Sequence, residues 1–178
     1  MDIRGSYINI GLIGDKVGFG DKVVKLLCTL DGLRCTKLEY PTNENYSDWI
    51  ECQLEQSGIE AAIERCIQSY MAKITGSFLL GGYELKDVLL RVEALPDHTN
   101  CFYIEMPELQ NPIFKDIDMA EQIIISFFKE ISVFEFSKGF CDSEAAAGDK
   151  MGYAISVDYK PSVNIRLQSW KIDGLTNR

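Results

Sequence analysis

The strongest constraint on the fold of this chain is a pair of alternating segments joined by a short polar turn. Residues 87–95 place Val88, Leu90 and Val92 on one face, and residues 101–106 alternate in the same way. A period of two indicates strands with one buried face. The five residues between the segments are typical of a turn, so the sequence predicts an antiparallel hairpin.

The patterns on either side of this hairpin add helices and more strands. Helices are too few and hairpins too many for a doubly wound parallel sheet. We therefore expect a single α+β domain over residues 1–178, with a mixed or mainly antiparallel sheet and about three helices packed on one face. Helices are predicted from Asp21 to Gly32, from Ser57 to Met71 with a short helix from Asp48 before it, and from Asp118 to Ser132; strands are predicted at 6–13, 33–40, 78–83, 134–141, 153–159 and 163–172.

Length and cysteine usage indicate an intracellular protein. A chain of 178 residues, 46% of them hydrophobic, can bury a core without disulfides. Its six cysteines are scattered without a Cys-x-x-Cys pair, and His98 is the single histidine, so neither a disulfide framework nor a metal site is expected. The start of the chain has no signal-peptide pattern, and no apolar run is long enough to span a membrane. We expect a cytoplasmic protein without a cofactor.

The glycine-rich loop at 14–20 follows a predicted strand and precedes a predicted helix, as phosphate-binding loops do. Its spacing fits neither common motif, because Gly20 is followed by Asp21 and Gly18-Phe19-Gly20 is not followed by a third glycine at the required position. Asp15 and Asp21 would also repel phosphate. An ordinary tight turn is favoured, and a small nucleotide- or metabolite-binding enzyme using this loop remains the alternative.

The residues that could support nucleophilic catalysis are few. Any Cys–His or Ser–His pair would have to use His98, which lies in the polar turn. Cys141 is followed by acidic residues, which raise a thiol pKa and oppose a reactive thiolate. No catalytic residue is predicted.

The charge of the chain is concentrated in its middle. Residues 41–149 hold twenty acidic and seven basic residues, within a net charge of -9. An acidic surface repels nucleic acid and attracts a basic protein, although the same acidity can simply keep a protein soluble. Residues 142–149 look like an exposed connection beside the aromatic residues Phe134, Phe136 and Phe140, with Glu105 and Glu108 extending an acidic rim. The predicted partner-binding residues are Asp142, Glu144, Glu135 and Asp149.

Four segments carry a resemblance to a known class of protein. They are Gly-Ser-Tyr-Ile-Asn-Ile-Gly-Leu at 5–12, Phe-Leu-Leu-Gly-Gly-Tyr at 78–83, Val-Leu-Leu-Arg-Val-Glu at 88–93 and Phe-Cys-Asp-Ser-Glu-Ala at 140–145. In this order the chain resembles bacterial immunity proteins of polymorphic toxin systems over about two-thirds of its length. The resemblance implies a cytosolic, non-enzymatic protein that neutralises a cognate toxin by binding it, and it supplies no site residues.

Overall fold

The structure, a computed structural model, describes residues 7–107, 110–144 and 154–167, with residue 144 described in its backbone. Nine strands of this part of the chain form one open sheet in which every neighbouring pair is antiparallel. The sheet order is β3-β2-β4-β5-β6-β1-β7-β8-β9. The strands are β1 (Tyr7–Asp15), β2 (Arg34–Pro41), β3 (Trp49–Gln53), β4 (Lys73–Leu80), β5 (Tyr83–Leu95), β6 (Thr99–Pro107), β7 (Lys138–Glu144), β8 (Ala154–Asp158) and β9 (Asn164–Leu167).

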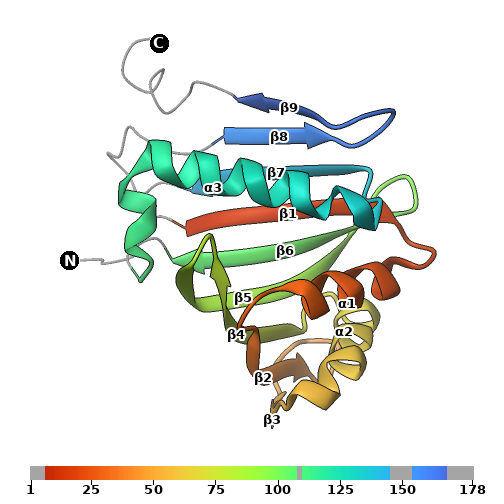
Figure 1. Cartoon of the computed structure of the whole chain (residues 1–178). Coiled ribbons are helices and arrows are strands. Elements are labelled where there is room, and N and C mark those ends of the chain that lie inside the picture. The colour runs from red at the N-terminus through yellow and green to blue at the C-terminus, as the bar shows by residue number, and fades with distance from the viewer. Residues whose placement is uncertain (1–6, 108–109, 145–153, 168–178) are drawn as a thin grey trace.

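Three α-helices in the described chain pack on one face of this sheet, as the sequence predicts (Figure 1). They are α1 (Phe19–Thr29), α2 (Ile59–Gln68) and α3 (Ile117–Glu130). In Figure 1, α3 lies across β1 and β7, while α1 and α2 pack together over the other half of the sheet. The expected α+β class and the mainly antiparallel sheet are confirmed.

The core lies between the helices and the inner face of the sheet. Alternation along β1 buries Ile8, Ile10 and Leu12 completely, and the predicted hairpin of β5 and β6 buries every second residue in the same way. On the helix side of the sheet, α3 buries four residues, so its extended apolar character is explained mainly by burial. The contributors from β5, β6 and α3 are Val88, Leu90, Val92, Phe102, Ile104, Met106, Ala120, Ile124, Phe127 and Phe128.

Several predicted boundaries are wrong, each because pairing or a cap outweighs the local pattern. The short helix predicted from Asp48 is the strand β3, which pairs with β2. Helix α2 ends at Gln68, before Tyr70 and Met71, and its N-cap is Gly58 rather than Ser57. The strand predicted at 78–83 ends at Leu80, because Gly81 and Gly82 form the tight turn between β4 and β5, with positive φ at both residues.

A buried asparagine anchors β5 where its pairing with β6 stops. Asn111 is fully buried and lies just before the short 3-10 helix η2 (Pro112–Lys115). Its side chain accepts from the Lys86 N–H at 2.7 Å and donates to the Lys86 carbonyl at 3.1 Å and to the Pro107 carbonyl at 2.8 Å. The amide thus pairs with the backbone of Lys86 as a neighbouring strand residue would.

Asn111→Ala is expected to lower the free energy of unfolding by about 2–4 kcal/mol, because it leaves backbone groups of Lys86 and Pro107 without these partners. Denaturant unfolding of the full chain measures the change. Asn164→Ala, which removes an exposed asparagine from the edge strand β9, is the matched control and should change stability by less than about 0.5 kcal/mol. Equal effects of the two variants would contradict the role assigned to Asn111.

Candidate functional site

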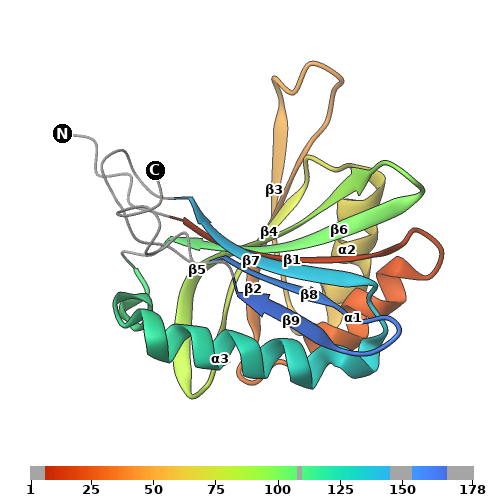
Figure 2. The ribbon, with the colours of Figure 1, turned by 90° about the horizontal axis from the view of Figure 1, so that it is seen from above.

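The face of the sheet opposite the helices carries a continuous row of outward-facing positions. In Figure 2, α1 and α3 lie below the sheet, and the hairpin between β2 and β3 rises above it. Strand register connects one position of every strand into this row. From β3 to β9 its members are Glu51, Glu39, Lys73, Arg91, Tyr103, Gly11, Phe140, Ser156 and Arg166, and we call this surface the outer face.

Arg91, Tyr103 and Phe140 form a cluster in the middle of the outer face. The Arg91 guanidinium lies 4.0 Å from the centre of the Tyr103 ring, within cation–π range. The Tyr103 and Phe140 rings meet edge to face with their centres 6.0 Å apart. Three half-buried residues from three strands thus bring two aromatic rings and one cation together on this face.

A glycine makes the position of Phe140 possible. Gly11 lies directly between Tyr103 and Phe140 in the strand register, and the Phe140 ring covers it. A Cβ atom at position 11 would collide with the Phe140 ring. Any larger residue at position 11 would therefore push this ring away from the sheet.

Two carboxylates hold Arg91 in place. Its Nε donates to Glu105, and its guanidinium also contacts Glu93 at 3.5 Å. Burial lowers the pKa of Arg91, but the hydrogen bond and charge of Glu105 outweigh that effect, so the net shift is upward and the cation is maintained. Burial also raises the pKa of the Tyr103 phenol, which keeps this hydroxyl protonated.

The structure separates the four predicted partner-binding residues. Asp142 and Glu144 belong to strand β7, so the prediction that they lie in a connection is wrong, whereas Asp142 is exposed as expected. Asp142 lies on the outer face, where it accepts a hydrogen bond from the Asn9 side-chain amide at 3.2 Å. Glu135 is exposed before β7, at the opposite end from Asp142, and its carbonyl accepts from Lys22 Nζ at 2.9 Å. Asp149 lies outside the described residues.

The predicted acidic rim around three aromatics is only partly reproduced. Phe140 lies on the outer face, but Phe136 is fully buried, where its ring meets Phe19 edge to face. Glu105 is paired with Arg91, and Glu108 lies outside the described residues. Sequence reasoning assigned no role to Arg91, Tyr103 or Gly11, although the outward position of Arg91 followed from its place between the buried residues Leu90 and Val92.

The glycines of the loop at 14–20 are explained by folding. Gly18 is the N-cap of α1 and has a φ of 74°, which favours glycine. A Cβ at Gly20 would come within 3.1 Å of Glu64 and Ile67 of α2, so this glycine permits the close approach of α1 and α2. Between them, Phe19 is buried in the core. The glycine content of the loop is therefore not an argument for a phosphate site.

The residues considered for catalysis are also explained structurally. His98 is exposed in the turn between β5 and β6, with a φ of 57°. Burial raises the pKa of Cys141, and the charge of Asp142 adds to the effect. Within the described residues, no group of three or more metal-ligating side chains could hold a metal ion. Among the helices described, none combines the length and apolar character needed to cross a bilayer.

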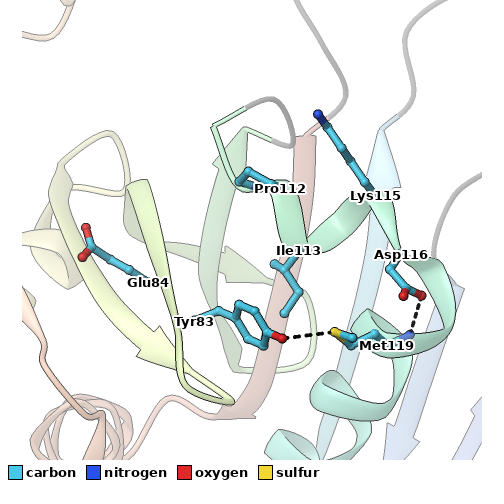
Figure 3. A pocket seen from close by; sticks show the side chains of 7 residues that line it. All are labelled: Tyr83, Glu84, Pro112, Ile113, Lys115, Asp116 and Met119. Carbon is cyan, nitrogen blue, oxygen red and sulfur yellow. Dashed lines mark hydrogen bonds between the residues drawn. The ribbon is translucent and has the colours of Figure 1, made fainter.

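A pocket of about 490 Å³ lies on the helix side, between the start of β5 and the start of α3 (Figure 3). The Tyr83 hydroxyl reaches the Met119 sulfur at 3.4 Å, and Asp116 caps α3 by accepting from the Met119 N–H at 3.1 Å. Lys115 and Glu84 also line it, and in Figure 3 both side chains point away from the contact between Tyr83 and Met119. Its lining is mostly apolar, which suits an apolar group rather than a reaction.

Comparison with protein-family models, with curated proteins and with solved structures finds no match to this chain. The geometry of the outer face is consequently the main guide to function.

All six cysteines are free thiols in the structure. Burial raises the pKa of Cys35 to about 11 and those of Cys66 and Cys101 to about 12, so these groups stay protonated at pH 8. Only Cys28 is exposed.

We therefore expect a chromogenic disulfide reagent at pH 8 to modify Cys28 rapidly in the native protein and all six thiols in denaturant without reductant. Cys28→Ala should remove the rapid phase. Two or fewer reactive thiols in denaturant would contradict the expected cytoplasmic location.

Proposed function

We propose that this protein is a non-enzymatic binding protein of the cytoplasm that neutralises a cognate bacterial toxin by direct contact through its outer face. The observation that carries the proposal is the cluster of Arg91, Tyr103 and Phe140 on the side of the sheet that α1, α2 and α3 leave uncovered. A sheet face of this composition suits recognition of another protein.

The chemistry of the cluster matches residues that dominate binding energy at protein interfaces. Tyrosine and arginine are enriched among such residues because they combine large contact area with directional polar groups. Glu105 fixes Arg91, and Gly11 fixes the place of Phe140, so binding would immobilise little that is not already ordered. The surface is therefore preorganised for binding.

Charge favours a basic partner. The net charge of -9 opposes nucleic acid and attracts a positively charged protein surface from a distance. Asp142 places one of these charges beside the aromatic cluster, since it follows Phe140 by two positions in β7. In this proposal the acidic residues speed the encounter with the partner, and the aromatic cluster sets the lifetime of the complex.

The identity of the partner as a toxin comes from the sequence resemblance to immunity proteins. Two of the four resembling segments, 88–93 and 140–145, contain the outer-face residues Arg91 and Phe140. Neutralisation would follow from occupying the toxin surface, without a reaction in this chain. No observation on the glycine loop favours the alternative of a nucleotide-binding enzyme.

Tyr103→Ala is expected to shorten the life of the complex with the cognate toxin, because it removes the centre of the cluster. The expected loss is about 2 kcal/mol or more, or a roughly 30-fold faster dissociation in a surface-binding measurement. Tyr83→Ala removes an exposed tyrosine on the helix side and is the matched control. Cells that co-express the toxin should lose protection with Tyr103→Ala and keep it with Tyr83→Ala. Identical dissociation rates for the two variants would contradict binding through the outer face.

Removing negative charge should act on association instead. Asp142→Asn combined with Glu144→Gln is expected to lower the association rate at low salt, with the deficit shrinking as salt is raised. Asn9→Ala removes the hydrogen bond to Asp142 without changing charge and separates the local contact from the charge effect. An unchanged association rate at low salt would remove Asp142 and Glu144 from the interface.

A further inference from the structure

The loop between β2 and β3 projects from the body of the protein on the side of the outer face. Figure 2 shows this hairpin rising from the sheet, away from α1 and α3. We call residues 42–49 the hairpin tip. Its base continues the outer face, because Glu39 of β2 and Glu51 of β3 belong to the row that contains Arg91 and Tyr103.

A dense set of hydrogen bonds fixes the conformation of the hairpin tip. The Asn43 side chain accepts from the Ser47 N–H at 3.0 Å, and donates to the Ser47 hydroxyl at 2.8 Å and to the Asp48 carboxylate at 3.2 Å. The Thr42 N–H donates to the Asp48 carbonyl at 2.8 Å, and the Ser47 hydroxyl donates to Asn45 at 2.8 Å. A loop tied in this way has little freedom left to lose on binding.

One residue of the hairpin tip is held in an unfavourable backbone conformation. Tyr46 has a φ of 58°, a left-handed value that a bulky residue seldom adopts. Its N–H donates to the Asn43 carbonyl at 3.2 Å. Its own carbonyl accepts from the indole N–H of Trp49 at 2.9 Å. These two hydrogen bonds hold the Tyr46 backbone in its left-handed conformation.

The hairpin tip presents two large aromatic residues to solvent. Tyr46 is 51% exposed and Trp49 is 40% exposed. The Trp49 indole N–H, its one polar group, is already hydrogen-bonded, so the exposed ring surface is apolar. Lys73 Nζ lies 5.6 Å from the centre of this ring. Exposed tryptophan and tyrosine on a rigid support are the residue types that anchor protein complexes.

The charged residues of the chain segment that carries these aromatics are all acidic, and Lys73, which lies against the Trp49 ring, comes from strand β4. No lysine or arginine occurs between Lys37 and Arg65, whereas seven acidic residues do. Two of them, Glu44 and Asp48, lie in the hairpin tip and are exposed. A partner surface that accepts the tip must therefore combine cationic side chains with an apolar recess.

We infer that the hairpin tip is an insertion element that enters a concave, positively charged cleft of the partner protein. Tyr46 and Trp49 fill the apolar recess, while Glu44 and Asp48 face cationic side chains at its rim. The outer face then contacts the surface beside the cleft, because the tip and the outer face lie on the same side of the molecule. This inference rests on the proposed function and adds the shape and chemistry of the partner site.

Site-specific photo-crosslinking in the source cell separates this inference from the proposed function. In three versions of the full-length protein, the photoreactive p-benzoylphenylalanine replaces Tyr46, Tyr103 or, as the helix-side control, Tyr83. The expected result is the same protein crosslinked from positions 46 and 103 and not from position 83, as identified by mass spectrometry. Crosslinking from position 103 alone would overturn the insertion and leave the proposed function standing, whereas none from either position counts against both.

Binding kinetics with the purified crosslinked protein test the chemistry of the cleft. Trp49→Ala is expected to speed dissociation at least about tenfold. Glu44→Gln with Asp48→Asn should lower the association rate at low salt, and Glu60→Gln with Glu64→Gln, an equal charge change on α2, should lower it less. Equal association rates for the two double variants would contradict a cationic rim around the partner cleft. An unchanged dissociation rate for Trp49→Ala would contradict an apolar recess that holds this side chain.

Asn43→Ala tests whether the rigidity of the hairpin tip matters. The variant removes no aromatic ring and no charge, yet it should weaken binding by about tenfold because binding must then order the tip. Hydrogen exchange should speed up in residues 42–49 and stay unchanged in β1, which distinguishes a loosened tip from a damaged fold. Unchanged affinity with a loosened tip would overturn the role of preorganisation.

Discussion

The position of β1 between β6 and β7 is the interaction on which the rest of the structure depends. Ile10 pairs with Ile104 on one side and with Cys141 on the other, and all three side chains are buried. Without this strand the sheet would divide into β3-β2-β4-β5-β6 and β7-β8-β9, and α3 would lose one of the two strands that it covers in Figure 1. The same pairing brings Tyr103 and Phe140 to either side of Gly11 and so builds the outer face.

The inner face of the sheet supplies stability, and under the proposed function the outer face supplies recognition. Along each strand, alternate residues go to a core that is closed by helices or to a face that is not. Val92 and Phe102 pair on the inner face, while the neighbouring pair of Arg91 and Tyr103 forms the centre of the outer face. The outer residues can therefore vary with a partner while the inner ones maintain the fold.

The sequence predicts the elements of this protein better than their arrangement. Apolar periodicity identifies β1, the β5–β6 hairpin and all three helices, because alternation and the helical repeat are local properties. It does not reveal that Arg91, Tyr103 and Phe140 meet, since only strand order and register bring them together. Composition also misplaces Asp142, where the polar sequence suggests a loop but pairing with Asn9 extends the strand. The strand β3 is missed because its five residues show no alternation and their pairing follows a turn organised by Asn43.

The central place of β1 has a consequence for the newly made protein. The ribosome produces this strand before its partners β6 and β7, whose synthesis takes on the order of ten seconds more. During that time Ile8, Ile10 and Leu12 have no sheet to join, and the nascent chain carries an unpaired apolar segment. Such a segment is what chaperones bind, and slow long-range pairing extends its exposure. Under the proposed function, rapid protection would therefore require a reserve of folded molecules rather than fresh synthesis.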